Sequence, residues 1–274
     1  MSDSTRRYMF AGHAIGVATR FHRLDDTSVN EVPPAQGAVV LAPTGGRSEG
    51  RAANFRYDVT RPRQRCLMAV DRVYTWVEGR DPDGRFETES TAEVDGWHVL
   101  EKLHIDAIRL HLLAVRNGMD SLAVVSTNGS SVQGLRMGNV TARITFDHEP
   151  LTHTGSQAQL ADFYRTRDDA YRTRNAGRFH TTADGRELAD DHGHHRFSLV
   201  SGIELDGPET EKQSISLENR YTIYWRGFGR IILGEVHVKA QDRRICLVRL
   251  AMGSDGGGTG TGGGTSGNGT TTGG

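Results

Sequence analysis

The stretch "VTARITF", residues 140–146, decides the fold class of this chain because apolar and polar residues alternate along it. The apolar side chains share one face and the polar ones the other: Val140, Ala142, Ile144 and Phe146 against Thr141, Arg143 and Thr145. Successive side chains of a β-strand point to opposite faces, so strict alternation is the pattern of a strand with one buried face. The stretch therefore predicts a half-buried strand.

Similar runs recur on both sides of this stretch. They alternate in polarity or are rich in aromatic and β-branched residues: "MFAGHAIGVATRFH" (9–22), "RVYTWVEG" (72–79), "RFSLVSGIEL" (196–205), "RYTIYWRGF" (220–228) and "RIILGEVHVKA" (230–240). Turn-forming sequences separate them, such as the "DPDG" of residues 81–84 and the "NG" pairs at 117–118 and 128–129. Many strands with frequent turns predict an all-β fold, a mainly antiparallel sandwich or a barrel-like arrangement.

Two segments depart from this pattern. Residues 97–115 fit a helix with leucines at heptad spacing, but they also fit a long strand whose facing flips near Ala107 and Ile108, as a β-bulge would cause. Periodicity leaves both interpretations open. Residues 157–177 place aromatic residues and a leucine at helical intervals among charges, with Gly177 as a stop, and predict one inserted helix.

Composition and charge argue against some functional classes. The 274 residues carry a formal net charge of −1 with a pI near 6.9, and the basic run at residues 56–65 contains no recognition motif, so no nucleic-acid partner is expected. A protein partner or self-association is expected instead.

No apolar run reaches the length of a membrane span, and the first residues lack the apolar core of a secretion signal. The default expectation is a cytoplasmic protein without a membrane span, with leaderless export left open.

The cysteines and the C-terminal segment bear on the redox state and on the domain limits of the chain. Cys66 and Cys246 are interpreted as free thiols rather than a disulfide, because nothing marks an oxidising compartment. Residues 254–274 consist mostly of Gly and Thr and contain no apolar side chain whose burial could offset the entropy of ordering. The sequence therefore predicts a single β-rich domain over residues 6–253 and a disordered, flexible Gly/Thr-rich tail over residues 254–274.

The C-terminal part also carries the most specific local pattern. "FGRIILGEVHVKAQDRRICLVRLAMGSDGGG", residues 228–258, resembles the ending of an uncharacterised family of β-rich bacterial proteins, in which FG-x-I-x-x-GE precedes RR-x-x-x-x-RL-x-x-GS. "RYMFAGHAIGVATRF" (7–21), "VPPAQGAVVLAPTGGRSEGR" (32–51) and "SSVQGLRMGNVTARITFD" (130–147) resemble the same family. The resemblance implies one β-rich unit and favours a strand over residues 97–115. It implies no activity and no catalytic residues.

The histidine-rich loop "DDHGHH", residues 190–195, is the one candidate metal site. Imidazole and carboxylate are suitable ligands for zinc and other divalent metals. The candidate ligands are Asp191, His192, His194 and His195. Their spacing matches no strong motif, and a further ligand would have to come from a distant residue such as His180 or Glu204. A solvated polar loop without a tightly bound metal is therefore the favoured interpretation, and no other cofactor is predicted.

A second set of histidines lies in the ambiguous segment. His104 and His111 would share one face of a helix, whereas as parts of a strand they are expected to point to opposite faces. Histidines bonded to backbone groups explain this set, which also contains His98, better than a ligand site does.

No sequence feature assigns a catalytic residue, and the chain lacks a G-x-S-x-G motif. The favoured function is a non-enzymatic interaction or structural β module. One alternative is a metal-dependent hydrolase that uses the loop of residues 190–195. The other is a glycan-binding β-sandwich in which Trp76, Trp97 or Trp225 stacks on a sugar.

Overall fold

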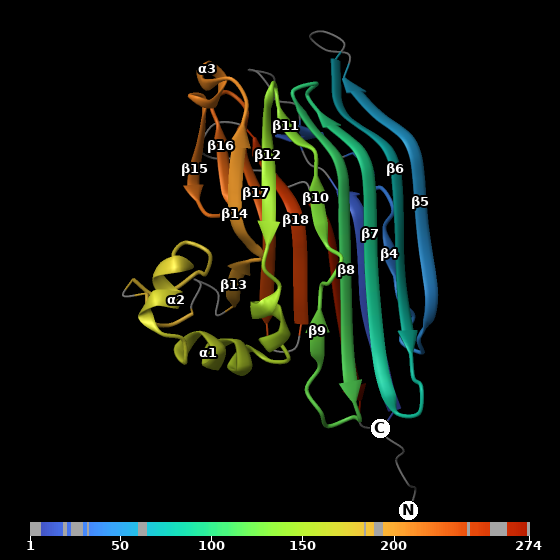
Figure 1. Ribbon diagram of the computed structural model, residues 1–274. Coiled ribbons are helices and arrows are strands. Elements are labelled where there is room, and N and C mark those ends of the chain that lie inside the picture. Colours follow the sequence, from blue (N-terminus) through green and yellow to red (C-terminus); the bar gives the residue numbers. More distant parts are fainter. Residues whose placement is uncertain are drawn as a thin grey trace, which may run out of the picture.

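The computed structural model describes residues 7–18, 21–22, 30–31, 33–59, 65–183, 185–188, 194–239, 242–252 and 262–272. These residues form two large antiparallel sheets, a two-stranded sheet and a few short helices (Figure 1). The larger sheet curves as a half-barrel, so the predicted all-β, mainly antiparallel fold class is confirmed.

The nine-stranded sheet contains the longest strands of the molecule. Its strands are β5 (Gly46–Val59), β6 (Arg65–Arg80), β7 (Arg85–Val99), β8 (Leu103–Asn117), β9 (Val124–Ser126), β10 (Ser131–Gln133), β11 (Leu135–Met137), β12 (Val140–Phe146) and β14 (Val200–Asp206). Their order is β14-β12-β11-β8-β7-β6-β5, and β9 and β10 pair with β8. Strands β5 to β8 pair with their neighbours in sequence, so this part of the sheet is a simple meander.

The eight-stranded sheet brings the two ends of the chain together. Its strands are β1 (Arg7–Ala18), β4 (Val39–Val40), β13 (His195–Ser198), β15 (Ile215–Asn219), β16 (Thr222–Trp225), β17 (Gly229–Lys239), β18 (Asp242–Met252) and β19 (Gly262–Thr272). Their order is β15-β16-β17-β18-β19-β1-β4, and β13 pairs with β17. The two-stranded sheet consists of β2 (Phe21–His22) and β3 (Asn30–Glu31).

The two large sheets share one hydrophobic core. Leu67, Ile108 and Leu110 of the nine-stranded sheet and Ile231 and Leu247 of the eight-stranded sheet belong to the same cluster of buried side chains. Burial of this apolar area is the main stabilising contribution to such a fold. In the described part of the chain, no helix is long and apolar enough to cross a membrane.

Strand β12 confirms the prediction from alternation. Val140 and Ala142 are buried and Ile144 is half-buried against the core, whereas Thr141 and Arg143 are exposed. The ambiguous residues 97–115 fall in the β7–β8 hairpin, so they form strands and not a helix. Alternating burial in β8 changes phase between Ile105 and Ile108, which is where the sequence predicts a flip of the facing.

The flip in β8 belongs to a line of irregular residues that crosses five segments of the nine-stranded sheet. These residues, which we call the crease, are Asn54, Asp71, Gly96, Asp106 and Gly134. Each lies between regular pairs of the ladder, and Asn54, Gly96 and Gly134 have left-handed φ values of 51°, 60° and 63°. A Cβ atom on Gly96 or Gly134 would collide with the carboxylate of Asp71 or Asp106, respectively. The crease therefore requires glycine at these two positions.

Helices interrupt the strands mainly between β12 and β13. This insertion, residues 149–188, begins with the 3₁₀ helix η1 (Glu149–His153) and continues with α1 (Gln157–Arg165) and α2 (Asp169–Arg174). The short α3 (Glu209–Lys212) lies between β14 and β15. The single predicted helix over residues 157–177 is thus two helices, because Asp168 caps a new one by accepting a 2.7 Å hydrogen bond from the Tyr171 amide.

The Gly/Thr-rich segment contributes strand β19, which pairs with β1 and β18. Such pairing uses backbone groups alone, and residues 253–261 and 273–274 lie outside the described residues. The flexible tail over residues 254–274 and the domain limits of 6–253 stay predictions, which deletion of the segment tests.

Candidate functional site

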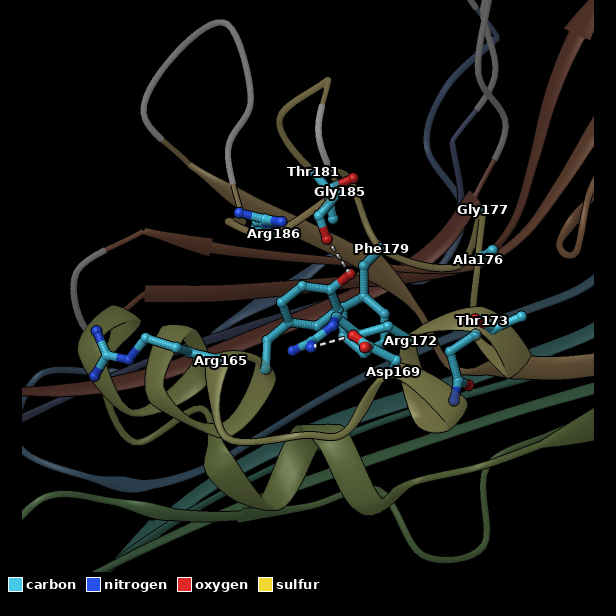
Figure 2. A pocket seen from close by; sticks show the side chains of 12 residues that line it. Arg165, Asp169, Arg172, Thr173, Ala176, Gly177, Phe179, Thr181, Gly185 and Arg186 are labelled. Carbon is cyan, nitrogen blue, oxygen red and sulfur yellow. Dashed lines mark hydrogen bonds and ion pairs between the residues drawn. The ribbon is translucent and has the colours of Figure 1, made fainter.

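A cavity of about 740 Å³ opens between α1, α2 and the segment that follows them (Figure 2). Its volume is in the range of small-molecule sites. The lining residues are Tyr164, Arg165, Asp169, Arg172, Thr173, Asn175, Ala176, Gly177, Phe179, Thr181, Gly185 and Arg186. We call this cavity the insertion pocket.

Two aromatic rings form the apolar wall of the insertion pocket. Tyr164 and Phe179 are both buried, with ring centroids 5.1 Å apart. The Phe179 ring stacks in turn on Phe197 of β13 at 5.5 Å, which connects the wall to the core. Burial raises the pKa of Tyr164, and its hydroxyl donates a 3.0 Å hydrogen bond to the Gly185 carbonyl. This bond fixes α1 to the segment on the opposite side of the pocket.

The rim of the pocket carries more positive than negative charge. Arg172 donates 2.6 Å bonds to the Asp169 carboxylate and to the Arg167 carbonyl, so its side chain is held in place. The bond and charge of Arg172, together with the charge of Arg186, lower the pKa of Asp169. Arg165 extends away from the other lining side chains (Figure 2). Among the described residues that line the pocket, Asp169 is the carboxylate, and Arg172 bonds to it while the charge of Arg186 also acts on it.

Arg178 anchors the insertion to both sheets. Its side chain is completely buried and donates to the Asp147 carboxylate at 2.5 Å and to the carbonyls of Asp147 and Ser198 at 2.7 Å. Burial opposes ionisation of Asp147, but the bond from Arg178 outweighs it and lowers the pKa of that carboxyl. A buried arginine is tolerable because its donors find acceptors.

His180 anchors the next part of the same segment. Its Nδ1 accepts a hydrogen bond from Arg196 at 3.1 Å, and arginine can only donate. Neutral His180 therefore carries its proton on Nε2, which lies 3.1 Å from the Tyr221 hydroxyl. Because alternate residues of an extended segment face opposite ways, His180 points away from the pocket that Phe179 and Thr181 line.

An ion pair joins the buried Glu235 of β17 to the half-buried Arg249 of β18. Glu235 accepts bonds of 2.5 and 2.7 Å from Arg249. Burial opposes ionisation of Glu235, but these bonds outweigh it and lower its pKa. Both cysteines are free thiols, as predicted, and burial raises the pKa of the Cys246 thiol to about 12.

The histidine-rich loop is only partly described. Asp191 and His192 lie outside the described residues, whereas His194 precedes β13 and His195 begins it. Among the residues that the structure describes, no three His, Cys, Asp or Glu side chains converge as metal ligands. Of the distant candidates, His180 bonds to Tyr221 and Arg196, and Glu204 lies on β14 beside Arg143. The absence of a tightly bound metal from this loop stays a prediction.

The second set of histidines, His98, His104 and His111, lies within the described strands β7 and β8. His104 and His111 point to the same face of β8, because the crease shifts the alternation between them, so the expectation of opposite faces is wrong. His98 and His104 form a cross-strand pair with their Nδ1 atoms 3.0 Å apart. Burial, followed by the charge of His104, lowers the pKa of His98.

The three tryptophans differ in accessibility. Trp97 is fully buried in the core and cannot stack on a sugar. Arg47 covers the Trp76 ring at 4.6 Å, and Trp225 stacks on Phe228 at 4.9 Å. Trp76 and Trp225 are half-buried, so the glycan-binding alternative stays a prediction for these two rings.

Sequence reasoning did not identify the insertion pocket. Its wall and rim come from α1, α2 and residues 175–186, and helical spacing shows the apolar face of a helix without showing what lies opposite it. The sequence does contain one signal of this arrangement. Asp168 and Asp169 are typical of a helix N-terminus, so they indicate that a second helix begins inside the segment predicted as one helix.

Fold and site together define a β-rich protein with a ligand-sized pocket at a helical insertion. Residues 8–239 match a family described as a domain of unknown function (DUF8256), and the chain belongs to this family. The match ends before the RR-x-x-x-x-RL-x-x-GS pattern of residues 243–254. No curated protein and no solved structure matches the chain.

Proposed function

We propose that this chain is a non-enzymatic binding protein and that its ligand is an anion with a flat apolar group, held in the insertion pocket. The observation that carries the proposal is the placement of Arg172 and Arg186 at the rim of a pocket whose wall consists of Tyr164 and Phe179.

The two parts of the pocket suit the two parts of such a ligand. A flat apolar group would pack against the parts of the Tyr164 and Phe179 rings that line the pocket, which gains dispersion contacts although most of the surface of both rings is already buried. Arg172 uses only two of its five N–H donors in the bonds to Asp169 and Arg167. The remaining donors and Arg186 would pair with a carboxylate or phosphate of the ligand, since guanidinium matches both groups.

The anchors around the pocket support a preformed site. Arg178 and His180 flank Phe179 in sequence, and both are fixed by hydrogen bonds to the sheets. The Tyr164 hydroxyl holds the two sides of the pocket together through Gly185. A rigid site loses little conformational entropy on binding.

Calorimetric titration with phenyl phosphate tests the proposal, with inorganic phosphate and benzyl alcohol as probes of each half alone. We expect phenyl phosphate to bind at least about tenfold more tightly than either half, because both contacts form at once. Arg186→Gln should weaken binding by about tenfold or more without changing the melting temperature, since Arg186 is exposed.

Arg143→Gln is the matched control, because Arg143 is an exposed arginine on β12 that lies outside the pocket. It should bind phenyl phosphate like the wild type. Equal affinity in the Arg186→Gln variant, or no binding of phenyl phosphate at all, would overturn the proposal.

A further inference from the structure

We propose that His98 and His104 bind a first-row transition-metal ion such as Zn²⁺ between their Nδ1 atoms, on the outer face of the nine-stranded sheet. This site is independent of the insertion pocket. It is an open site, in which two protein nitrogens hold the ion and water completes the coordination. Among the described residues no three such ligands converge, so a site with two protein ligands is the form that the structure allows.

The distance between the two nitrogens suits a shared ion. His98 and His104 are directly paired across β7 and β8, with ring centroids 4.0 Å apart and Nδ1 atoms separated by 3.0 Å. Zinc binds imidazole nitrogen at about 2.0–2.1 Å, so two nitrogens on one tetrahedral ion lie about 3.3 Å apart. The pair therefore needs to open by only a few tenths of an ångström.

The surroundings orient His104 as a ligand. Its Nε2 lies 2.5 Å from Asp106, whose carboxylate accepts a 3.0 Å bond from Arg136. A carboxylate can only accept when ionised, so neutral His104 carries its proton on Nε2 and presents the lone pair of Nδ1 to His98. In the metal-free pair the Nδ1 of His98 donates this bond, and zinc binding requires His98 to carry its proton on Nε2 instead. A carboxylate on the distal nitrogen is the usual support of a metal-binding histidine.

The crease supplies a second carboxylate beside the pair. Asp71 is exposed on β6, its carboxylate lies over Gly96, and its charge acts on His98. Its negative charge and that of Asp106 act on His98 alongside the positive charge of Arg136, and the two carboxylates favour a bound cation. The charged groups facing the pair from the described strands β6, β8 and β11 are thus Asp71, Asp106 and Arg136.

The turn that joins β7 to β8 keeps His98 opposite His104, and two of its residues adopt a strained backbone conformation. Leu100 and Glu101 both have left-handed backbones, with φ values of 53° and 55°, which residues other than glycine rarely adopt. The turn keeps His98 opposite His104 a few residues away. Local strain of this kind is common where a site requires a fixed geometry.

Titration of tag-free, full-length protein with Zn²⁺ tests the proposal by calorimetry. We expect one site per chain in the wild type. His98→Asn and His104→Asn should each weaken zinc binding by at least about tenfold, and Asp106→Asn should weaken it by about tenfold through loss of orientation. Melting temperatures without zinc should match the wild type, because both histidines lie on the sheet surface.

The matched control is the double variant His194→Asn with His195→Asn, which removes the described histidines of the "DDHGHH" loop. It should bind zinc like the wild type. The proposal is overturned if the wild type binds no zinc, if His98→Asn and His104→Asn bind it unchanged, or if zinc binding is lost in the loop variant.

Discussion

The nine-stranded sheet and the helical insertion are stabilised in different ways. In the sheet, strands β5 to β8 pair with their neighbours in sequence over 12 to 14 positions, and β7 and β8 bury alternate apolar side chains. The insertion has short helices that add side chains such as Leu151 and Leu160 to the shared core. It is also held to the sheets by polar side chains, above all the buried Arg178 and the half-buried His180. Alternating apolar and polar residues thus form the sheet, and the hydrogen bonds of Arg178 and His180 position the insertion pocket on it.

The largest effect is expected from Arg178→Met, which removes the main anchor of the insertion. The variant leaves the Asp147 carboxylate and several carbonyls without their buried partner, which should cost about 3–5 kcal/mol of unfolding free energy. Urea denaturation measures the loss. A cost below about 1 kcal/mol would show that packing, and not the polar anchor, stabilises the insertion.

A smaller but substantial effect is expected on the sheet side of the comparison. Ile144→Asp places a charge against the core and should destabilise the protein by about 2–4 kcal/mol. Arg143→Asp changes the exposed face of the same strand, where Arg143 lies 3.7 Å from Glu204, and should cost about 0.5 kcal/mol. Similar effects from both substitutions would contradict the assigned facing of β12.

These two predictions differ in how far the sequence alone leads to them. The facing of Ile144 follows directly from "VTARITF", and turn sequences correctly divide many of the strands. The flip near Ala107 is also readable, but its extension to Asn54 and Gly134 needs the pairing register, which local sequence does not contain. Arg178 looks like any surface arginine in sequence, because its acceptors Asp147 and Ser198 lie directly after β12 and on β13, far from it along the chain.

Acid should weaken the anchor of the insertion. The bond from Arg178 lowers the pKa of Asp147 in the folded protein below its ordinary value near 3.9. The unfolded chain therefore takes up this proton first, so the stabilisation is present above about pH 4 and is lost as the pH falls towards the folded pKa. The urea midpoint of Asp147→Asn should fall less between about pH 5 and about pH 3 than that of the wild type. An equal fall would exclude this carboxylate as a source of acid sensitivity.

The smallest effect is expected from deletion of residues 254–274. Residues 254–274 contain no apolar side chain whose burial could stabilise the fold, and the backbone bonds of β19 are exchanged for bonds to water. The melting temperature should change by no more than about 2 °C. A larger drop would show that β19 is an essential part of the eight-stranded sheet and that the flexible-tail prediction is wrong.

Hydrogen exchange of the intact protein with and without saturating phenyl phosphate tests most directly whether the insertion is the functional part. A ligand in the insertion pocket should slow exchange in α1, α2 and residues 175–188, while strands β5 to β8 exchange as before. This protection should be absent in Arg186→Gln. Protection centred on the nine-stranded sheet, or protection in the insertion that persists in Arg186→Gln, would contradict the account.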